Sequence, residues 1–377
     1  MESASAPKNE ASFSKEMTGM LKGIAIMLMF VHHFFTFPNW YPGTVDYSSW
    51  CITFTRYFCA PTKICVGIFA FITGYFYYYG KKKDFRYSVR KIHQLLLRYW
   101  IIALPLILLS IAAGVYTFTP GGFAMEMFGI TSDVMKFAWY VYFYIILMFF
   151  LPVLIKLLRD KPLFILLFML VPFQILMRGL LYLSSSSEIW KLVVSNLCLH
   201  TQTAVIGYLA ARTGLFSKAK ALAQKVPSWL RLLLCAALAV GAFMLRYKIF
   251  VKELRTPSLG PVSFIFYFNV DIFCVPVLIF ARSELLMYIE KKSAGRALSL
   301  LGKYSVYMWF WHCMFFGASG KFTKELLYAP QNPFLVYLWG LLICLCLAFV
   351  TDKIVNAIVQ LRKGKSSDKA SEKAPKS

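Results

Sequence analysis

The chain has 377 residues, of which 59% are hydrophobic and 15% charged, and its mean hydropathy is +0.61. These proportions exclude a soluble globular protein with a polar surface and indicate a polytopic membrane protein. The net charge of +24 does not indicate nucleic-acid binding, because the basic residues are spread over loops and flanks instead of forming one face. Contact with anionic lipid headgroups explains them more simply.

Apolar runs long enough to cross a bilayer recur along the chain, since a spanning helix needs about 20 mostly apolar residues. Ten candidate spans predict an all-α bundle. They cover residues 17–38, 64–80, 92–115, 137–158, 162–183, 190–211, 229–250, 262–283, 304–318 and 333–359. Basic residues concentrate in alternate connections, which predicts that both chain ends are cytoplasmic. The segment 246–255, which begins with Arg246, is an exception on the assigned outer side.

Polar segments flank the apolar region. Residues 1–16 and 360–377 are rich in Ser, Lys, Ala and Glu, and this composition predicts disordered ends. The predicted transmembrane domain therefore covers residues 17–359. Because the first apolar run is long and follows a polar leader, we expect no cleavable signal peptide.

The first span has a lysine, Lys22, near one end and two histidines, His32 and His33, near the other. Exposing such groups to lipid is costly, so they are expected to face the bundle interior and to have a function. In a helix, eleven residues return to within about 20° of the start. Lys22 and His33 therefore share a face, about 16 Å apart along the axis, whereas His32 points elsewhere.

Cysteines are scattered along the chain, nine in all. Cys51 and Cys59 lie in the connection after the first span and are able to pair, but free thiols are the favoured interpretation. The spacing of Cys and His residues matches no metal site, so we expect no metal.

The second span ends in a tyrosine-rich belt, which suits the headgroup interface, and a dense basic stretch follows it. One interpretation is that this stretch is only a cytoplasmic anchor. The other is a site for a phosphate-bearing donor, because guanidinium groups bind phosphates through paired, charge-assisted hydrogen bonds. The residues of that candidate site are Arg86, Arg90, Lys91 and Arg98.

Two later spans also contain polar side chains. Asn269 and Asp271 lie well inside the eighth span, and the carboxylate needs a cationic or imidazole partner, for which the histidines are natural candidates. In the ninth, Ser305 and His312 are two helical turns apart on one face. A histidine in such a setting is more often a packing residue than a catalyst.

These patterns together resemble the acyltransferase-3 family, ten-helix membrane enzymes that O-acylate cell-surface carbohydrates. The resemblance extends over about residues 17–359. Family members have a basic residue, usually Arg, and a histidine separated by ten residues in the first helix, and Lys22 and His33 have this spacing. The family's Phe-rich segment with a Ser-Gly-Tyr-like end is similar to Thr73, Gly74 and Tyr75. Its aromatic fourth helix is similar to the segment with Trp139 and Tyr140. Its late Trp-His segment is similar to Ser305, Trp309, Trp311 and His312.

The resemblance implies transfer of an acyl group, usually acetyl, from cytoplasmic acyl-CoA to a hydroxyl of a cell-surface or exported glycan, in the inner membrane of a bacterium. His33 would be the principal catalytic residue, with His32 as its rival. The imidazole would act as a base or carry the acyl group transiently. Lys22 would hold the donor or stabilise developing negative charge, and Arg90 and Arg98 would bind CoA phosphates. Acetyl versus succinyl transfer stays open.

Two other classes of protein fit the same polar residues. A transporter or flippase for a lipid-linked or polymeric glycan would also line its substrate pathway with polar side chains on several helices. Dependence on acyl-CoA discriminates it from an enzyme. An acyltransferase-like scaffold without catalysis would tolerate His33→Ala.

Overall fold

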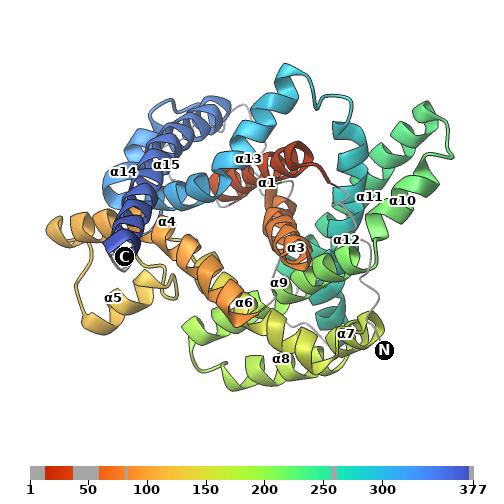
Figure 1. Ribbon diagram of the computed structural model, residues 1–377, viewed down its shortest axis with the longest axis horizontal. Helices are drawn as coiled ribbons and strands as arrows, with labels where there is room; N and C mark the ends of the chain where they lie inside the picture. The colour runs from red at the N-terminus through yellow and green to blue at the C-terminus, as the bar shows by residue number, and fades with distance from the viewer. Residues whose placement is uncertain (1–12, 37–58, 81–83, 256–260, 373–377) are drawn as a thin grey trace, which may run out of the picture. The chain divides into compact units, whose positions relative to one another are not determined.

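A computed structural model describes residues 13–36, 59–80, 84–255 and 261–372, and within these ranges the regular structure is entirely helical (Figure 1). The chain divides into two compact units. The described residues up to Lys91, Phe143–Lys303 and Gln331–Pro333 form the first unit. Residues Ile92–Tyr142, Tyr304–Pro330 and the described residues from Phe334 onward form the second.

Long helices alternate with short connecting ones. In chain order they are α1 (Lys15–Phe35), the short 3-10 helix η2 (Ala60–Lys63), α3 (Ile64–Tyr78), α4 (Phe85–Ala112), α5 (Pro120–Met127), α6 (Tyr140–Leu157), α7 (Pro162–Leu170), α8 (Pro172–Leu183), α9 (Glu188–Arg212), α10 (Leu215–Ala223), α11 (Ser228–Arg255), α12 (Pro261–Leu286), α13 (Ser293–His312), η3 (Cys313–Phe315), α14 (Gly320–Tyr328) and α15 (Pro333–Glu372).

Seven segments in the described part of the chain are long and apolar enough to cross a membrane, and they indicate a multi-pass membrane protein. They lie in α1, α4, α6, α7 with α8, α9, α11 and α15. Each predicted span overlaps a helix, but α3, α12 and α13 are not among the seven. Ten crossings and two cytoplasmic ends therefore stay predictions. The helix α15 continues to Glu372, beyond the predicted domain end at residue 359.

In the first unit, α3 and α9 lie side by side with their backbones in contact (Figure 1). A Cβ atom on Gly74 would lie 1.7 Å from the carbonyl oxygen of Ala204, and one on Gly207 would lie 2.1 Å from that of Phe71. Small residues are the common means of close approach between membrane helices. The glycine of the Thr73-Gly74-Tyr75 motif is therefore a packing residue of this unit.

A second backbone contact joins α1 to α13. A Cβ on Gly302 would lie 1.8 Å from the Gly19 carbonyl oxygen, and one on Gly23 would lie 2.1 Å from that of Leu298. The Ser299 hydroxyl donates to the Glu16 carbonyl oxygen at 3.3 Å beside this crossing. Gly19 and Gly23, which are four residues apart on α1, thus allow this helix to pack closely against α13.

An ion pair is enclosed in the first unit. The Arg246 Nε atom of α11 lies 2.9 Å from Asp271 Oδ1 of α12, and each side chain is 1% exposed. The carboxylate also packs on α3, because a Cβ on Gly67 would lie 3.4 Å from Asp271 Oδ2. The partner of Asp271 is therefore a cation, one of the two kinds of partner that the sequence predicts, but it is Arg246 and not one of the histidines named as candidates. Arg246 itself, assigned from sequence to an outer segment, lies inside a helix.

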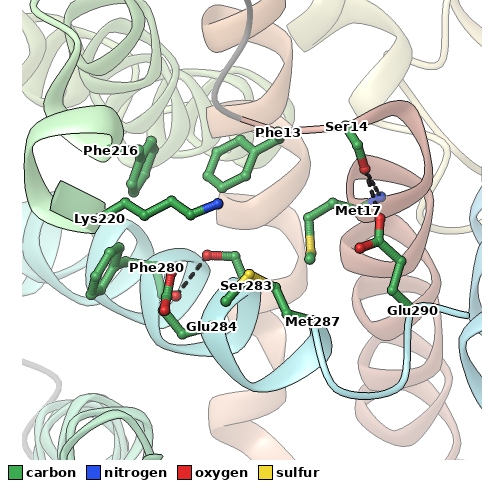
Figure 2. A pocket seen from close by; sticks show the side chains of 10 residues that line it. All are labelled: Phe13, Ser14, Met17, Phe216, Lys220, Phe280, Ser283, Glu284, Met287 and Glu290. Atoms are coloured by element: carbon green, nitrogen blue, oxygen red, sulfur yellow. Dashed lines mark hydrogen bonds between the residues drawn. The ribbon is translucent and has the colours of Figure 1, made fainter. Parts of the chain in front are cut away.

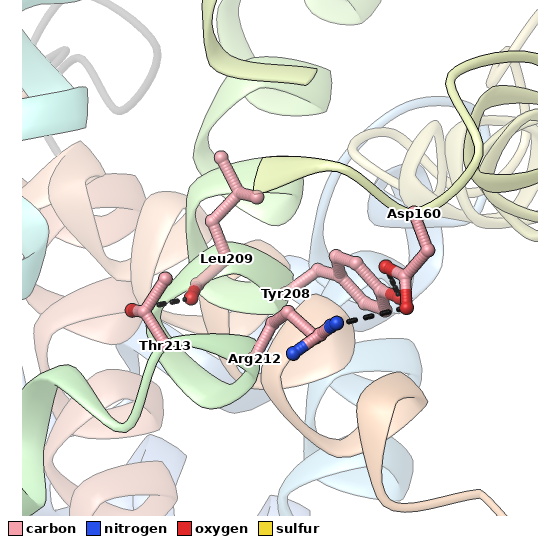
Figure 3. A network of polar contacts seen from close by, with 5 residues as sticks. All are labelled: Asp160, Tyr208, Leu209, Arg212 and Thr213. Atoms are coloured by element: carbon pink, nitrogen blue, oxygen red, sulfur yellow. Dashed lines mark hydrogen bonds and ion pairs between the residues drawn. The ribbon is translucent and has the colours of Figure 1, made fainter. Parts of the chain in front are cut away.

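A polar latch ties the α6–α7 connection to the end of α9 (Figure 3). Tyr208 donates its hydroxyl hydrogen to Asp160 Oδ1 at 2.6 Å, and Arg212 Nε donates to Asp160 Oδ2 at 3.0 Å. Arg159 and Asp160 both have a φ of 51°, a left-handed conformation that costs non-glycine residues about 1–3 kcal/mol each. These bonds hold the strained turn against the end of α9, and α10 follows directly.

Substituting Gly302 tests the α1–α13 contact. We expect Gly302→Ala to lower the free energy of unfolding by about 1–3 kcal/mol, because the added methyl group forces two backbones apart. Gly241→Ala is the matched control, since that glycine also lies in a helix but a Cβ there meets nothing within 4 Å. Alanine should instead stabilise that position by about 1 kcal/mol. Unfolding in mixed detergent micelles measures both, and equal effects would contradict the contact.

A double-mutant cycle tests the Arg246–Asp271 pair. Arg246→Met alone leaves a buried carboxylate without its arginine and should cost about 3–5 kcal/mol of unfolding free energy. Adding Asp271→Leu should recover most of that loss, because an apolar pair of similar volume needs no desolvated charge. The same unfolding titration gives the coupling energy, and simple additivity of the two single variants would show that the charges do not interact.

Candidate functional site

The two histidines lie in the last turn of α1 in the first unit. His32 is 5% exposed and His33 is 7% exposed, so both imidazoles are buried as the sequence predicts. Their ring centroids lie 5.1 Å apart. His32 Nδ1 lies 3.5 Å from the Cys59 carbonyl oxygen and 3.3 Å from Thr36 Oγ1. His32 is thus tied to the start of η2, while Cys51 lies outside the described residues.

Lys22, at the other end of the shared face of α1, lines an open pocket of about 570 Å³. It is half-buried, and two more lysines, Lys15 and Lys303, line the same pocket. One acidic residue, Glu16, also lines this pocket. The remaining lining residues are Phe13, Thr18, Gly19, Phe76, Ser299 and Gly302. We call this the lysine pocket.

The lysine pocket depends on the α1–α13 crossing. Gly19 and Gly302, which touch there, are themselves lining residues, and Lys303 directly follows Gly302. Sequence reasoning found Lys22 but missed Lys15 and Lys303. The spacing of Gly19 and Gly23 was a signal for a close helix contact, but local sequence does not say which helix supplies the partner.

The basic residues predicted to bind the donor lie along α4. Arg86 and Arg90 are exposed, and the Lys91 ammonium lies 5.6 Å from the centre of the Tyr87 ring. None of these three cations lines the lysine pocket. Arg98, in the second unit, lies over the Tyr307 ring at 5.7 Å. A donor-binding role for these four residues stays a prediction.

Of the polar pair predicted in the eighth span, Asp271 is held by Arg246 as described above. Asn269 lies in α12, but its side chain is outside the part of the chain that the structure describes. The 3-10 helix η2 packs on both α1 and α11. It therefore links the histidine end of α1 to the helix that carries Arg246.

In the second unit, His312 is fully buried among aromatic side chains. Its ring stacks on Phe137 with centroids 6.2 Å apart, and its Nδ1 atom contacts the Trp309 carbonyl oxygen. Trp309 Nε1 in turn donates to the Phe137 carbonyl oxygen at 3.3 Å, and its ring lies 4.7 Å from that of Tyr140. Phe137 adopts a left-handed φ of 76°, so this cage holds a strained residue.

The two remaining predicted residues lie close to this cage in sequence. Ser305 is 1% exposed on α13, and Trp139 is half-buried with its ring 6.1 Å from that of Tyr140. Sequence reasoning placed Trp139 and His312 in separate motifs. The structure connects them through Tyr140 and Trp309.

The buried carboxylate of Glu126 holds the connection between α5 and α6, which leads to the aromatic residues around His312. Glu126 Oε1 accepts hydrogen bonds from Thr131 Oγ1 at 2.9 Å and from the backbone N–H groups of Asp133 and Val134. Burial raises the pKa of Glu126 above its usual range, although these three bonds favour the ionised form. The Ser319 hydroxyl donates to the Val134 carbonyl oxygen at 2.7 Å, so this connection is tied to the start of α14.

The first unit places two kinds of chemically useful group on α1. An imidazole is able to accept a proton or to act as a nucleophile, and a lysine-lined pocket attracts anionic groups. In the described residues, no group of three or more His, Cys, Asp or Glu side chains is placed to hold a metal ion.

Comparisons with known proteins give one match. A family profile described as an acyltransferase domain matches residues 19–353. No curated protein and no solved structure matches the chain. The matched range covers nearly the entire sequence and includes both histidines, Lys22 and Lys303. The chain therefore belongs to acyltransferase family 3 and is a multi-pass membrane acyltransferase.

Proposed function

We propose that this protein transfers an acetyl group from cytoplasmic acetyl-CoA to a hydroxyl of a cell-surface or exported glycan, in the inner membrane of a bacterium. The observation that carries the proposal is the pairing, on α1, of a lysine-lined pocket with two buried histidines. The family match indicates acyl transfer, and the three lysines of the pocket favour an anionic acyl donor.

The lysine pocket suits the phosphates of CoA. Its volume of about 570 Å³ falls in the usual range for small-molecule sites, roughly 300–1,000 Å³. Three lysines against one glutamate give it a net positive charge, and ammonium groups are common phosphate ligands. The predicted orientation places this end of α1 on the cytoplasmic side, where acyl-CoA is available.

His33 is the proposed general base. As the acceptor hydroxyl attacks the thioester carbonyl, the imidazole takes its proton and a C–O bond forms. The tetrahedral oxyanion then collapses, the C–S bond breaks, and the leaving thiolate takes the proton to give free CoA and the ester. Lys22 shares the face of α1 with His33, so it holds the donor in line with the base. His32, bound at the start of η2, supports the position of the pair.

Alanine substitutions separate the two histidines. Labelled acetyl transfer from acetyl-CoA into the host's surface glycan fraction should fall about 10²- to 10⁴-fold in His33→Ala, because the general base is lost. His32→Ala should retain most of the transfer at matched protein levels. Equal background in wild type and both variants, with acceptor present and succinyl-CoA also tried, would overturn catalysis at this site and favour glycan export.

Lys22 provides a test of the donor pocket. Lys22→Gln should raise KM for acetyl-CoA roughly 10- to 150-fold, since a hydrogen bond to a charged group contributes about 1.5–3 kcal/mol. Lys22→Arg should stay near wild type, because it keeps the charge and is the residue usual in the family. Lys292→Gln, an exposed lysine that does not line the pocket, is the control. A KM unchanged in Lys22→Gln would show that donor binding lies elsewhere.

A further inference from the structure

A second, smaller pocket lies next to the lysine pocket, where the start of α1, α10 and the end of α12 meet (Figure 2). Its volume is about 110 Å³. Three phenylalanines and two methionines supply its apolar surface, and a lysine, two glutamates and two serines supply its polar groups. The lining residues are Phe13, Ser14, Met17, Phe216, Lys220, Phe280, Ser283, Glu284, Met287 and Glu290.

Phe13 separates the two pockets and lines both. Its ring lies 4.8 Å from that of Phe216 and 5.3 Å from that of Tyr75. It directly precedes Ser14, which caps α1 by accepting the N–H of Met17 at 2.9 Å. The ring is thus held where it lines both pockets, and one extended ligand can occupy both cavities by passing this side chain.

The small pocket combines flat apolar walls with both kinds of hydrogen-bonding group. Figure 2 shows the Lys220 side chain extending between Phe216 and Phe280 toward Phe13, so its ammonium group is a donor inside the pocket. Glu284 is buried and paired with Arg231 at 3.4 Å, which keeps an acceptor carboxylate at the wall.

Ser283 adds a second acceptor. Its hydroxyl donates to the Phe280 carbonyl oxygen at 2.7 Å, and its lone pairs stay available. A hydrocarbon chain in this pocket would form no hydrogen bond with Lys220, Glu284 or Ser283. A flat heterocycle with ring-nitrogen acceptors and an exocyclic amine satisfies both the walls and the polar groups.

We propose that this pocket binds the purine base of the acyl donor, an inference that rests on the proposed use of acyl-CoA. Aromatic side chains stack on bases of any kind, Lys220 donates to a ring nitrogen, and Glu284 and Ser283 accept from the exocyclic amine. The Lys220 side chain, which is half-buried and extends into the pocket, would move to make room for the base.

In this proposal, the two pockets bind different parts of the acyl donor along α1. The base lies beyond Phe13, the phosphates lie against Lys15, Lys22 and Lys303, and the pantetheine arm extends along the helix toward His33. The latch at Asp160 contributes indirectly. It fixes the end of α9, and α10 with Phe216 and Lys220 follows after the left-handed Gly214.

Donors with and without a nucleotide test the base site. With acetyl-CoA, Phe280→Leu should raise KM at least about fivefold, because loss of base stacking costs about 1–3 kcal/mol, or roughly 5- to 150-fold. Lys220→Gln should raise it at least as much, because a hydrogen bond from a charged donor is lost. With acetyl-pantetheine, which has neither base nor phosphate, KM should not change, and Phe280→Leu, which removes no charge, assigns the effect to the base. The matched controls are Lys218→Gln on α10 and Phe273→Leu on α12, two exposed residues outside the pocket.

Equilibrium binding of CoA and of pantetheine to the purified proteins separates the base site from the proposed function. If the wild type transfers acetyl but the variants affect both donors equally, the base site is wrong and the function stands. If the wild type binds CoA more tightly than pantetheine, the variants weaken that preference, and no acetyl is transferred, the base site stands and the function falls. Failure of the wild type to bind CoA overturns both.

Discussion

The contact between the backbones of α1 and α13 is the constraint on which the donor pocket depends. A side chain on Gly302 would clash with the Gly19 carbonyl oxygen and force the helices apart, and both glycines line the lysine pocket. Without this approach Lys303 would not join Lys15 and Lys22 around one cavity. Membrane helices have little hydrophobic drive to associate, so small residues that permit close packing determine which helices become neighbours. The position of the pocket is thus set by glycines that take no part in chemistry.

Buried charge imposes a second constraint on the first unit. An isolated ionised group is expensive in a bundle, and the Arg246–Asp271 pair is tolerated because each charge compensates the other within α11, α12 and the adjoining face of α3. The 3-10 helix η2 packs on α11 and also on α1, where the Cys59 carbonyl oxygen contacts His32. The ion pair and the histidine pair therefore lie in one packed region, in which η2 contacts both α1 and α11.

Sequence patterns predicted the helices better than the contacts between them. Hydropathy located helices at all ten predicted spans, and helical geometry predicted that Lys22 and His33 share a face, because both signals are local. Local sequence did not predict that Arg246 pairs with Asp271 or that Lys303 lines the same pocket as Lys22. In each case the two residues are on different helices, and their proximity depends on which helices touch. Arg246 was assigned to an outer segment by the order of the predicted spans, whereas α11 continues to Arg255 and the Arg246 side chain is buried. Phe13, Phe216 and Phe280 gave no signal at all, since scattered aromatic residues are abundant in this chain.

A single helix, α1, relates the two halves of the proposed reaction. Its first turns form walls of both the lysine pocket and the smaller aromatic pocket, and its last turn carries the histidines. The rise of an α-helix separates Lys22 from His33 by about 16 Å, so a donor whose phosphates lie at Lys22 must send an extended arm along the helix to place its thioester at the base. A compact acyl donor anchored at the lysines would not reach. In the proposed reaction, the length of α1 between these two groups therefore favours a donor with a long flexible arm.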